Sequence, residues 1–280
     1  MSKGLLDPKV DFVFKNIFGS PNHPEILISF LNATLKAKKK IVNVDIKKTD
    51  IEKQYIEDKY SRLDVKATTS NDEIINIEIQ LKNENNMVKR SLYYLSKMYE
   101  EQLNEKEDYS KLVRTVCINI LNFKYLKTDN FHTGYRFKEI ESNEELTDIM
   151  EVHFIEIPKL QDSSDEKDML VAWTEFLKDP ESEKVRGLEL SIEEIRQAKD
   201  ELIRMSNDST QRELYDMRAN SLRDKMSELN AAERKGIEKG REEGRKEEKI
   251  KIARNMKLSG LDINTIAKIT NLSEDEIDKL

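Results

Sequence analysis

Cysteine, proline and glycine are all scarce in this sequence of 280 residues. The single cysteine, Cys117, excludes both a disulfide framework and a cysteine-based zinc site within one chain. Only 5 prolines are present and none follows Pro180, so the last 100 residues can form long helices. No run of 18 apolar residues occurs, which excludes a hydrophobic membrane-spanning helix. Accordingly, we expect no membrane among the partners of this protein. We therefore expect a protein of the reducing cytoplasm.

Charge is distributed unevenly along the chain, although the formal net charge is only -7. Residues 151–200 contain 14 Asp and Glu against 7 Lys and Arg, so this segment alone accounts for the net acidity. The first 150 residues contain 24 residues of each sign and are neutral overall. Net acidity therefore does not exclude a nucleic-acid partner for the N-terminal part of the chain.

Hydrophobic periodicity predicts helices and strands in alternation over the first 158 residues. Apolar residues recur at helical spacing between residues 11 and 35, with a break at 19–21, which predicts two helices joined by a turn. Alternating or continuous β-branched runs predict strands at 40–46, 63–68, 74–82, 113–121 and 152–157, with a turn at 71–73 and a helix at 87–103. This order predicts an α/β fold in which helices flank a mixed sheet.

The remainder of the chain is predicted to be helical throughout. We expect an acidic helical region at 159–210, a long charged helix at 211–256 and a small helix-turn-helix-like tail at 257–280. The last helix of the tail carries four acidic residues and one lysine, namely Glu274, Asp275, Glu276, Asp278 and Lys279. Because DNA phosphates repel acidic side chains, this composition favours a protein as the partner of that helix.

The long charged helix carries a short apolar seam. Tyr215, Leu222 and Leu229 follow one another at seven-residue steps, and Met226 lies between the last two. So narrow an apolar face does not stabilise a helix alone, and it needs a partner surface. Either the N-terminal part of the chain or a second copy of the chain can provide that surface. We favour a second copy, which makes the protein a homodimer.

Two carboxylates mark a candidate metal site in the first half of the chain. Asp64 and Glu78 lie on the polar faces of two strands that the 71–73 turn connects, and a hairpin centred near residue 72 places Asp64 about opposite Gln80. Mg²⁺ prefers carboxylate oxygens, water and phosphate as ligands. The alternative is an ordinary polar face of a hairpin, and spacing alone leaves it open. Because both acids belong to a polar face, we expect alanine at either position to leave the fold intact.

A wider set of motifs resembles a known family. Asp64 is followed after thirteen residues by Glu78-Ile79-Gln80, and the chain also contains DFVFKNIFG at 11–19, RSLYYLSKMY at 90–99 and AKITNLS at 267–273. This combination resembles the recombination-promoting nuclease / putative transposase family of the PD-(D/E)XK nuclease superfamily. The resemblance implies a restriction-endonuclease-like core at 1–158, followed by a C-terminal all-helical extension.

The resemblance also implies a function and its residues. The expected activity is that of a divalent-metal-dependent DNA endonuclease, in which a metal-activated water cleaves the phosphodiester bond, with a role in DNA recombination or mobile elements of bacteria. Asp64 and Glu78 match the acids that bind Mg²⁺ or another divalent cation, and Gln80 matches the third catalytic position, where many members have lysine. Gln80 carries no positive charge, and Lys82 is an alternative source of it. Asp11 either completes the metal shell or pairs with Lys15 one helical turn away.

Further positions are predicted with alternatives. Lys89 and Arg90 begin the helix after the catalytic strand and, with Lys82, are candidate DNA contacts, the alternative being ordinary surface charge. The tyrosines at 93, 94 and 99 are expected to pack rather than to stack on bases. The three histidines, at 23, 132 and 153, lie in separate elements without ligand spacing, so no role is expected for them. A rival function is a catalytically inactive nuclease fold that acts as a binding or assembly module, which the missing lysine and the acidic 151–200 segment favour.

Overall fold

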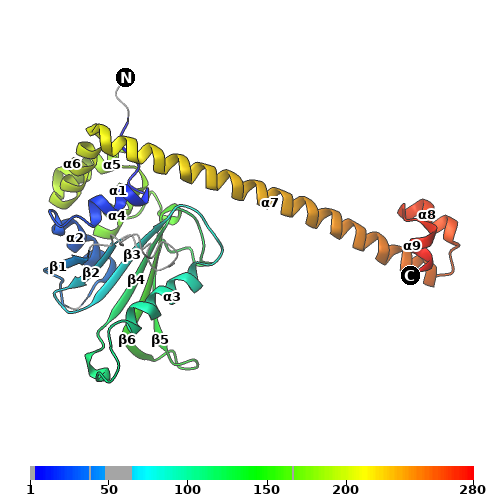
Figure 1. Cartoon of the computed structure of the whole chain (residues 1–280), viewed down its shortest axis with the longest axis horizontal. Helices are drawn as coiled ribbons and strands as arrows, with labels where there is room; N and C mark the ends of the chain where they lie inside the picture. The colour runs from blue at the N-terminus through cyan, green and yellow to red at the C-terminus, as the bar shows by residue number, and fades with distance from the viewer. Residues whose placement is uncertain (1–3, 38, 48–64, 166) are drawn as a thin grey trace. The chain divides into compact units, whose positions relative to one another are not determined.

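The protein divides into two compact units, Met1–Ala219 and Asn220–Leu280. The computed structural model describes residues 4–37, 39–47, 65–165 and 167–280 (Figure 1). Helix α7, Ser209–Leu258, runs across the boundary between the units. Within the described ranges, no helix is both long and apolar enough to cross a membrane, and the cytoplasmic location stays a prediction.

A mixed sheet forms the centre of the first unit. Over the described residues it has six strands in the order β1-β2-β3-β4-β6-β5. The strands are β1 (Val44–Lys47), β2 (Val65–Thr69), β3 (Ile74–Gln80), β4 (Thr115–Leu121), β5 (His132–Lys138) and β6 (Glu145–Glu156). The pairs β3–β4 and β4–β6 are parallel, and the other neighbours are antiparallel. The predicted α/β fold with a mixed sheet is confirmed.

One end of this sheet differs from the prediction. Strand β5 was not predicted, and β6 begins at Glu145, whereas only its last part, from residue 152, was predicted. The reason is physical, because β5 lies at the sheet edge and is mostly exposed, so it carries no continuous apolar face. Strand β1 also begins later than predicted, at Val44.

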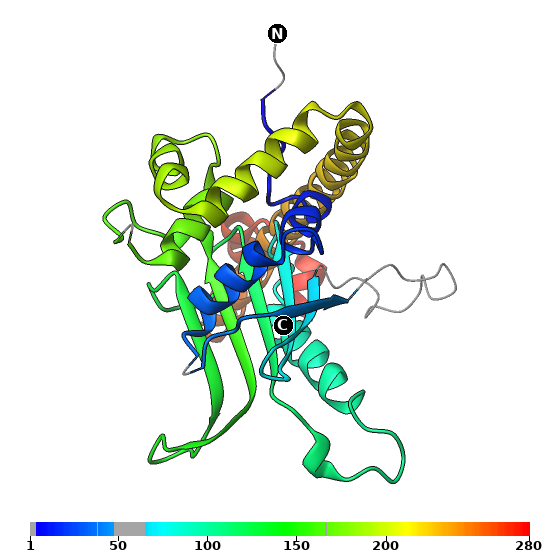
Figure 2. The ribbon, with the colours of Figure 1, turned by 90° about the vertical axis from the view of Figure 1, so that its left-hand side faces the viewer.

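Helices cover one face of the sheet with an aromatic core. This layer contains α1 (Asp11–Phe18), α2 (Pro24–Leu35), α4 (Met169–Lys178), α5 (Glu183–Ser191) and α6 (Glu193–Asn207). Helix α2 contacts both α4 and α6, so the acidic stretch after residue 159 lies against the N-terminal helices (Figure 2). The Phe18 ring meets Trp173 edge-on with centroids 5.3 Å apart, and the Trp173 indole N–H donates to Ser29 at 3.2 Å. The first two predicted helices and the turn between them are confirmed.

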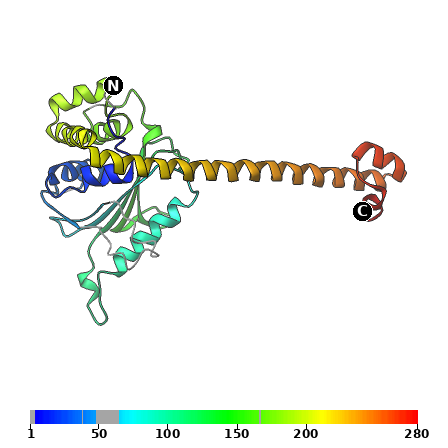
Figure 3. The ribbon, with the colours of Figure 1, turned by 45° about the horizontal axis from the view of Figure 1, so that its top comes forward.

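Helix α3, Met87–Glu100, covers the opposite face of the sheet (Figure 3). Its inner side chains Met87, Tyr94, Leu95 and Met98 form a buried cluster with Cys117, Leu121, Val152 and Phe154 of β4 and β6. Cys117 is fully buried, and burial raises the pKa of its thiol to about 12, as suits a small core residue. Both faces of β3 are therefore covered by helices, which decides the environment of its polar residues.

The second unit has a small core of its own. The end of α7, α8 (Ile263–Thr270) and α9 (Glu274–Asp278) surround Ala253, Ile266, Leu272 and Ile277. Gly260 follows α7 with φ 82°, a left-handed conformation that glycine adopts without strain. The Ser273 hydroxyl accepts from the Glu276 amide while the Glu276 carboxylate accepts from the Ser273 amide, which makes the capping box that begins α9.

Candidate active site

Glu78 lies near the end of a central strand and is fully buried. Register places it beside Asn119 of the parallel neighbour β4, and α3 covers both from above. The expectation that alanine at Glu78 leaves the fold intact therefore loses its basis, because truncation of a fully buried side chain opens a cavity. The sequence pattern is typical of an isolated hairpin with one solvent-exposed face. In the structure, the hairpin belongs to a larger sheet, and helix α3 covers that face.

An ion pair fixes one oxygen of the Glu78 carboxylate. The Arg90 Nε atom of α3 lies 3.1 Å from Glu78 Oε2, and the Arg90 guanidinium carbon lies 5.2 Å from the ring centroid of Tyr94. Burial raises the pKa of the Glu78 carboxyl above its ordinary value, and the charge of Arg90 opposes that rise. Arg90, predicted as a phosphate contact, thus touches the candidate catalytic acid directly.

The other oxygen of Glu78 has no hydrogen-bond partner among the described residues. The same holds for Oδ1 of Asn76, which lies two residues earlier on the same face of β3. The Asn76 amide nitrogen faces the Cys117 sulfur at 3.7 Å. Unsatisfied buried oxygens on two residues of one strand face are unusual, because a buried polar atom without a partner costs about 1–3 kcal/mol.

Two further polar residues surround this position and were not identified from the sequence. Asn119 accepts from Ser91 Oγ at 2.9 Å and donates to the backbone carbonyl of His153 at 3.1 Å. Its signal in the sequence is an amide inside the apolar run TVCINIL of β4. An amide inside a buried strand needs partners, so its presence indicates a polar position under the helix.

The partner acid of the sequence prediction, Asp64, lies outside the described residues. Val65, the next residue in sequence, begins β2 and pairs with Ile77. The predicted hairpin centre near residue 72 would have paired Val65 with Ile79, so the observed register differs by two residues. A shift of two keeps every side chain on its predicted face.

The remaining predicted site residues have separate surroundings. Asp11 Oδ2 pairs with Nη1 of Arg218 in α7 at 2.9 Å, and its Oδ1 accepts from the Phe12 amide at 2.7 Å. Gln80 and Lys82 are half-buried at and just beyond the end of β3, and Lys89 is exposed on α3. Among the described residues, no group of three or more His, Cys, Asp or Glu side chains is arranged to hold a metal ion.

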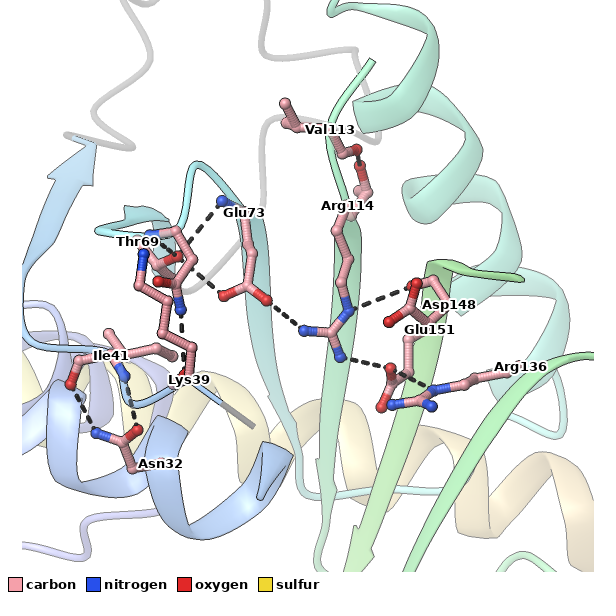
Figure 4. A network of polar contacts seen from close by, with 12 residues as sticks. Asn32, Lys39, Ile41, Thr69, Glu73, Val113, Arg114, Arg136, Asp148 and Glu151 are labelled. Carbon is pink, nitrogen blue, oxygen red and sulfur yellow. Dashed lines mark hydrogen bonds and ion pairs between the residues drawn. The ribbon is translucent and has the colours of Figure 1, made fainter. Parts of the chain in front are cut away.

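A second buried polar network occupies the other face of the sheet, near the start of the parallel strands (Figure 4). Arg114 joins the carboxylates of Glu73 and Glu151, and Arg136 Nε also donates to Glu151 at 2.8 Å. Burial alone would raise the pKa of Glu151, but hydrogen bonds from His153, Arg114 and Arg136 lower it to about 2. Both oxygens of Glu151 are therefore partnered, which is typical of a structural ion network.

The same network brings two histidines together. His153 Nε2 lies 2.5 Å from Glu151 Oε1, and His132 Nε2 lies 2.9 Å from His153 Nδ1. The two imidazoles stack with centroids 5.1 Å apart, and a Cβ at Gly134 would come within 3.1 Å of the His153 ring. Pairing of β5 with β6 creates this contact. This contact between residues 132 and 153 was not predicted, because β5 was not predicted.

Comparison with known families agrees with this mixed sheet flanked by helices, which is the arrangement of a nuclease-type α/β core. The family model for PD-(D/E)XK nuclease family transposases matches residues 8–232. The model for the Rpn/YhgA-like nuclease family C-terminal HTH domain matches residues 246–280. The chain therefore belongs to the PD-(D/E)XK nuclease family of transposases, and the predicted family and restriction-endonuclease-like fold are confirmed. A search of curated proteins gave no match, and a search of solved structures gave none either.

Proposed function

We propose that the protein is a divalent-metal-dependent DNA endonuclease that hydrolyses phosphodiester bonds in DNA recombination or mobile-element transfer. The family gives the nuclease class, and the match to a C-terminal HTH domain favours DNA as the partner, in place of the protein partner that the acidic composition of the last helix suggested. The observation that carries the proposal is the buried Glu78 carboxylate, one oxygen of which has no partner among the described residues. A buried anion with a vacant oxygen is suited to one more cation.

The proposal assigns Asp64 and Glu78 as the acids that hold Mg²⁺ or another divalent cation. Support for Asp64 is its place in sequence next to Val65, whose partner Ile77 precedes Glu78. When bound, the cation supplies charge for the phosphate and a more acidic water. Glu78 contributes one oxygen, while Arg90 keeps the other oxygen oriented at 3.1 Å.

The other site residues have supporting roles in this proposal. Gln80 orients the water or a phosphate oxygen by hydrogen bonds, since an amide carries no charge. Lys82, Lys89 and Arg90 contribute positive charge where the DNA backbone passes. Asp11 is the third acid, although its ion pair with Arg218 gives it an alternative, structural role.

We also propose that two copies associate through α7. The proposed domains of each copy are a nuclease core at 1–158, the helical regions 159–210 and 211–256, and the tail 257–280. Met226 and Leu229 are 40% and 37% exposed on an otherwise charged helix, which supports the seam as a contact. Tyr215 takes another role, because its hydroxyl lies 3.4 Å from the Asp7 amide. Glutamate at Leu222 and Leu229 together is expected to turn a dimer into a monomer in light scattering; an unchanged mass would contradict it.

The second candidate function is a catalytically inactive nuclease fold that acts as a binding or assembly module. Gln80 in place of a lysine favours it, as does the Glu78–Arg90 ion pair, which neutralises the acid without a metal. Plasmid DNA incubated with the full chain separates the two functions. Nicking that requires Mg²⁺ or Mn²⁺, stops with EDTA and is lost in Glu78→Gln supports the enzyme. Absence of metal-dependent nicking with every divalent cation tried supports the module.

A further inference from the structure

The neighbour of Glu78 on strand β4 is a fully buried amide. Asn119 pairs with Glu78 in the parallel register of β3 and β4, and both side chains are fully buried. Register partners point to the same face of a sheet, which here is the face that α3 covers. Leucine has the same branched shape as asparagine and needs no hydrogen-bond partner. An amide at this position therefore indicates a requirement for directed hydrogen bonds.

Asn119 connects three elements that surround the candidate site. Its Oδ1 accepts from the Ser91 hydroxyl of α3 at 2.9 Å, and its Nδ2 donates to the carbonyl of His153 in β6 at 3.1 Å. The Ser91 hydroxyl also lies 2.8 Å from the Met87 carbonyl, one turn earlier in α3. One buried amide thus joins α3 to the parallel strands β4 and β6.

Most of the buried face of α3 is apolar and does not fix the rotation of the helix. Tyr94 is buried against β4 and β6 with its apolar neighbours, whereas Tyr93 is 51% exposed, so the expectation that all three tyrosines pack is wrong for Tyr93. Apolar packing is non-directional, but a hydrogen bond weakens steeply when its angle changes. The bond between Ser91 and Asn119 is therefore suited to fix the rotation of α3 on the sheet.

The rotation of α3 decides where the Arg90 guanidinium lies. Arg90 directly precedes Ser91, and successive helical residues lie about 100° apart around the axis. Arg90 Nε is 3.1 Å from Glu78 Oε2, while the Ser91 hydroxyl meets Asn119, the register partner of Glu78. A rotation that broke the bond of Ser91 would also move Arg90 away from Glu78.

We propose that Asn119 and Ser91 are positioning residues of the nuclease. Their hydrogen bond fixes α3 so that Arg90 holds one oxygen of Glu78 and leaves the other oxygen available to the divalent cation. The inference rests on the proposed function for the cation, and it adds two residues that act through Arg90. Groups behind a metal ligand orient that ligand, and their loss typically lowers metal affinity by about 10–100-fold.

The test measures Mn²⁺ binding to the full chain by isothermal titration calorimetry without DNA, so cleavage does not enter the result. Ser91→Ala is expected to weaken Mn²⁺ binding by about ten-fold. Ser206→Ala is the matched control, because the buried Ser206 hydroxyl also donates one turn back in its helix, to Leu202 at 2.6 Å, and accepts from the Leu6 amide at 3.0 Å. Ser206 belongs to α6, on the other face of the sheet, so its variant should bind Mn²⁺ as the wild type does.

A double variant separates positioning from stability. Replacing both partners of a buried hydrogen bond by apolar groups of similar shape is close to neutral for folding. Ser91→Ala combined with Asn119→Leu should therefore unfold in urea near the wild-type midpoint, while Mn²⁺ binding is still weakened by about ten-fold. Wild-type Mn²⁺ affinity in this variant would mean that the pair serves the fold alone, and it would overturn the inference.

The inference and the proposed function fail separately. Mn²⁺ binding that is weakened by Glu78→Gln but unchanged by Ser91→Ala refutes only the positioning role. If the wild-type chain binds no Mn²⁺, the proposed function fails, and a double-mutant cycle of Ser91→Ala with Glu78→Gln in urea unfolding then decides the positioning role. Non-additive losses of stability would show that Ser91 and Glu78 are coupled through Arg90, and additive losses would refute it.

Discussion

Two buried glutamates on opposite faces of one sheet differ in how completely they are partnered. Glu151 has both oxygens engaged, by His153 on one side and by Arg114 and Arg136 on the other. Glu78 has one oxygen on Arg90 and the other without a partner among the described residues. A buried charge is stable when every lone pair is satisfied, so Glu151 serves the fold. Glu78 remains incomplete, as a ligand-binding group would be.

The pKa values of the two glutamates are shifted in opposite directions. Hydrogen bonds lower the pKa of Glu151 to about 2 in spite of its burial. Burial raises the pKa of Glu78, because Arg90 and the neighbouring Asn76 side chain, which both lower it, do not compensate for the loss of water. The comparison predicts that variants in the Glu151 network lower stability, whereas variants at Glu78 lower activity.

The largest expected effect on stability comes from Arg114, which joins two buried carboxylates. Arg114→Met leaves Glu73 and Glu151 without that cation and is expected to lower the free energy of unfolding by about 3–5 kcal/mol. Urea unfolding followed by circular dichroism measures it. Arg204→Met, which removes an exposed pair with Glu201, is the control and should cost less than about 1 kcal/mol. Equal losses of unfolding free energy in the two variants would mean that the buried Arg114 network stabilises the fold no more than an exposed ion pair does.

Acid sensitivity is expected from His132 in the same network. Burial, with the neighbouring His153 and Lys36, lowers the pKa of His132 from 6.5 to about 4. The unfolded chain therefore takes up this proton first, so the stability is intact above pH 6.5 and falls by about 2–3 kcal/mol as the pH drops to 4. His132→Phe should flatten this part of the pH profile. A steep profile in His132→Phe would assign the effect elsewhere.

The smallest expected effect on stability concerns Asp11, which either only pairs with Arg218 or also binds the cation. If Asp11 serves only its ion pair with Arg218, then Asp11→Asn and Arg218→Gln each cost less than about 1 kcal/mol and leave cleavage unchanged. If Asp11 also binds the cation, as proposed, then Asp11→Asn alone reduces plasmid nicking. The prediction is that only Asp11→Asn reduces nicking. Equal activity in both variants would remove Asp11 from the site.

Local patterns made much of the fold predictable. The break at Gly19-Ser20-Pro21, the alternation in β3 and the apolar run of β4 correspond directly to elements of the structure. The edge strand β5 was not predictable in this way, because an exposed edge strand carries no buried face to mark it. The long-range contact of His132 with His153 was lost with it.

The candidate site was predictable in its residues and not in its environment. The motif gave Glu78, and the helix after it gave Arg90, but the ion pair between them depends on how α3 lies on the sheet. Burial of Glu78 depends likewise on β4 and α3, which are distant in sequence from the 71–73 turn. Asn119 and Ser91 complete the surroundings only after these elements have packed.

Cleavage and stability measured together for Glu78→Gln and Glu151→Gln test the account most directly. Loss of a cation ligand removes several kcal/mol of transition-state stabilisation, so Glu78→Gln should lower Mg²⁺-dependent plasmid nicking by about a thousand-fold. Its free energy of unfolding should fall by less than that of Glu151→Gln, because burial already disfavours the Glu78 charge, as the raised pKa of Glu78 indicates, and glutamine keeps the shape of the side chain. Glu151→Gln should lose about 3–5 kcal/mol of stability and keep its activity per folded molecule. Full nicking by Glu78→Gln, or a stability loss there as large as at Glu151, would contradict the assignment of Glu78 to function.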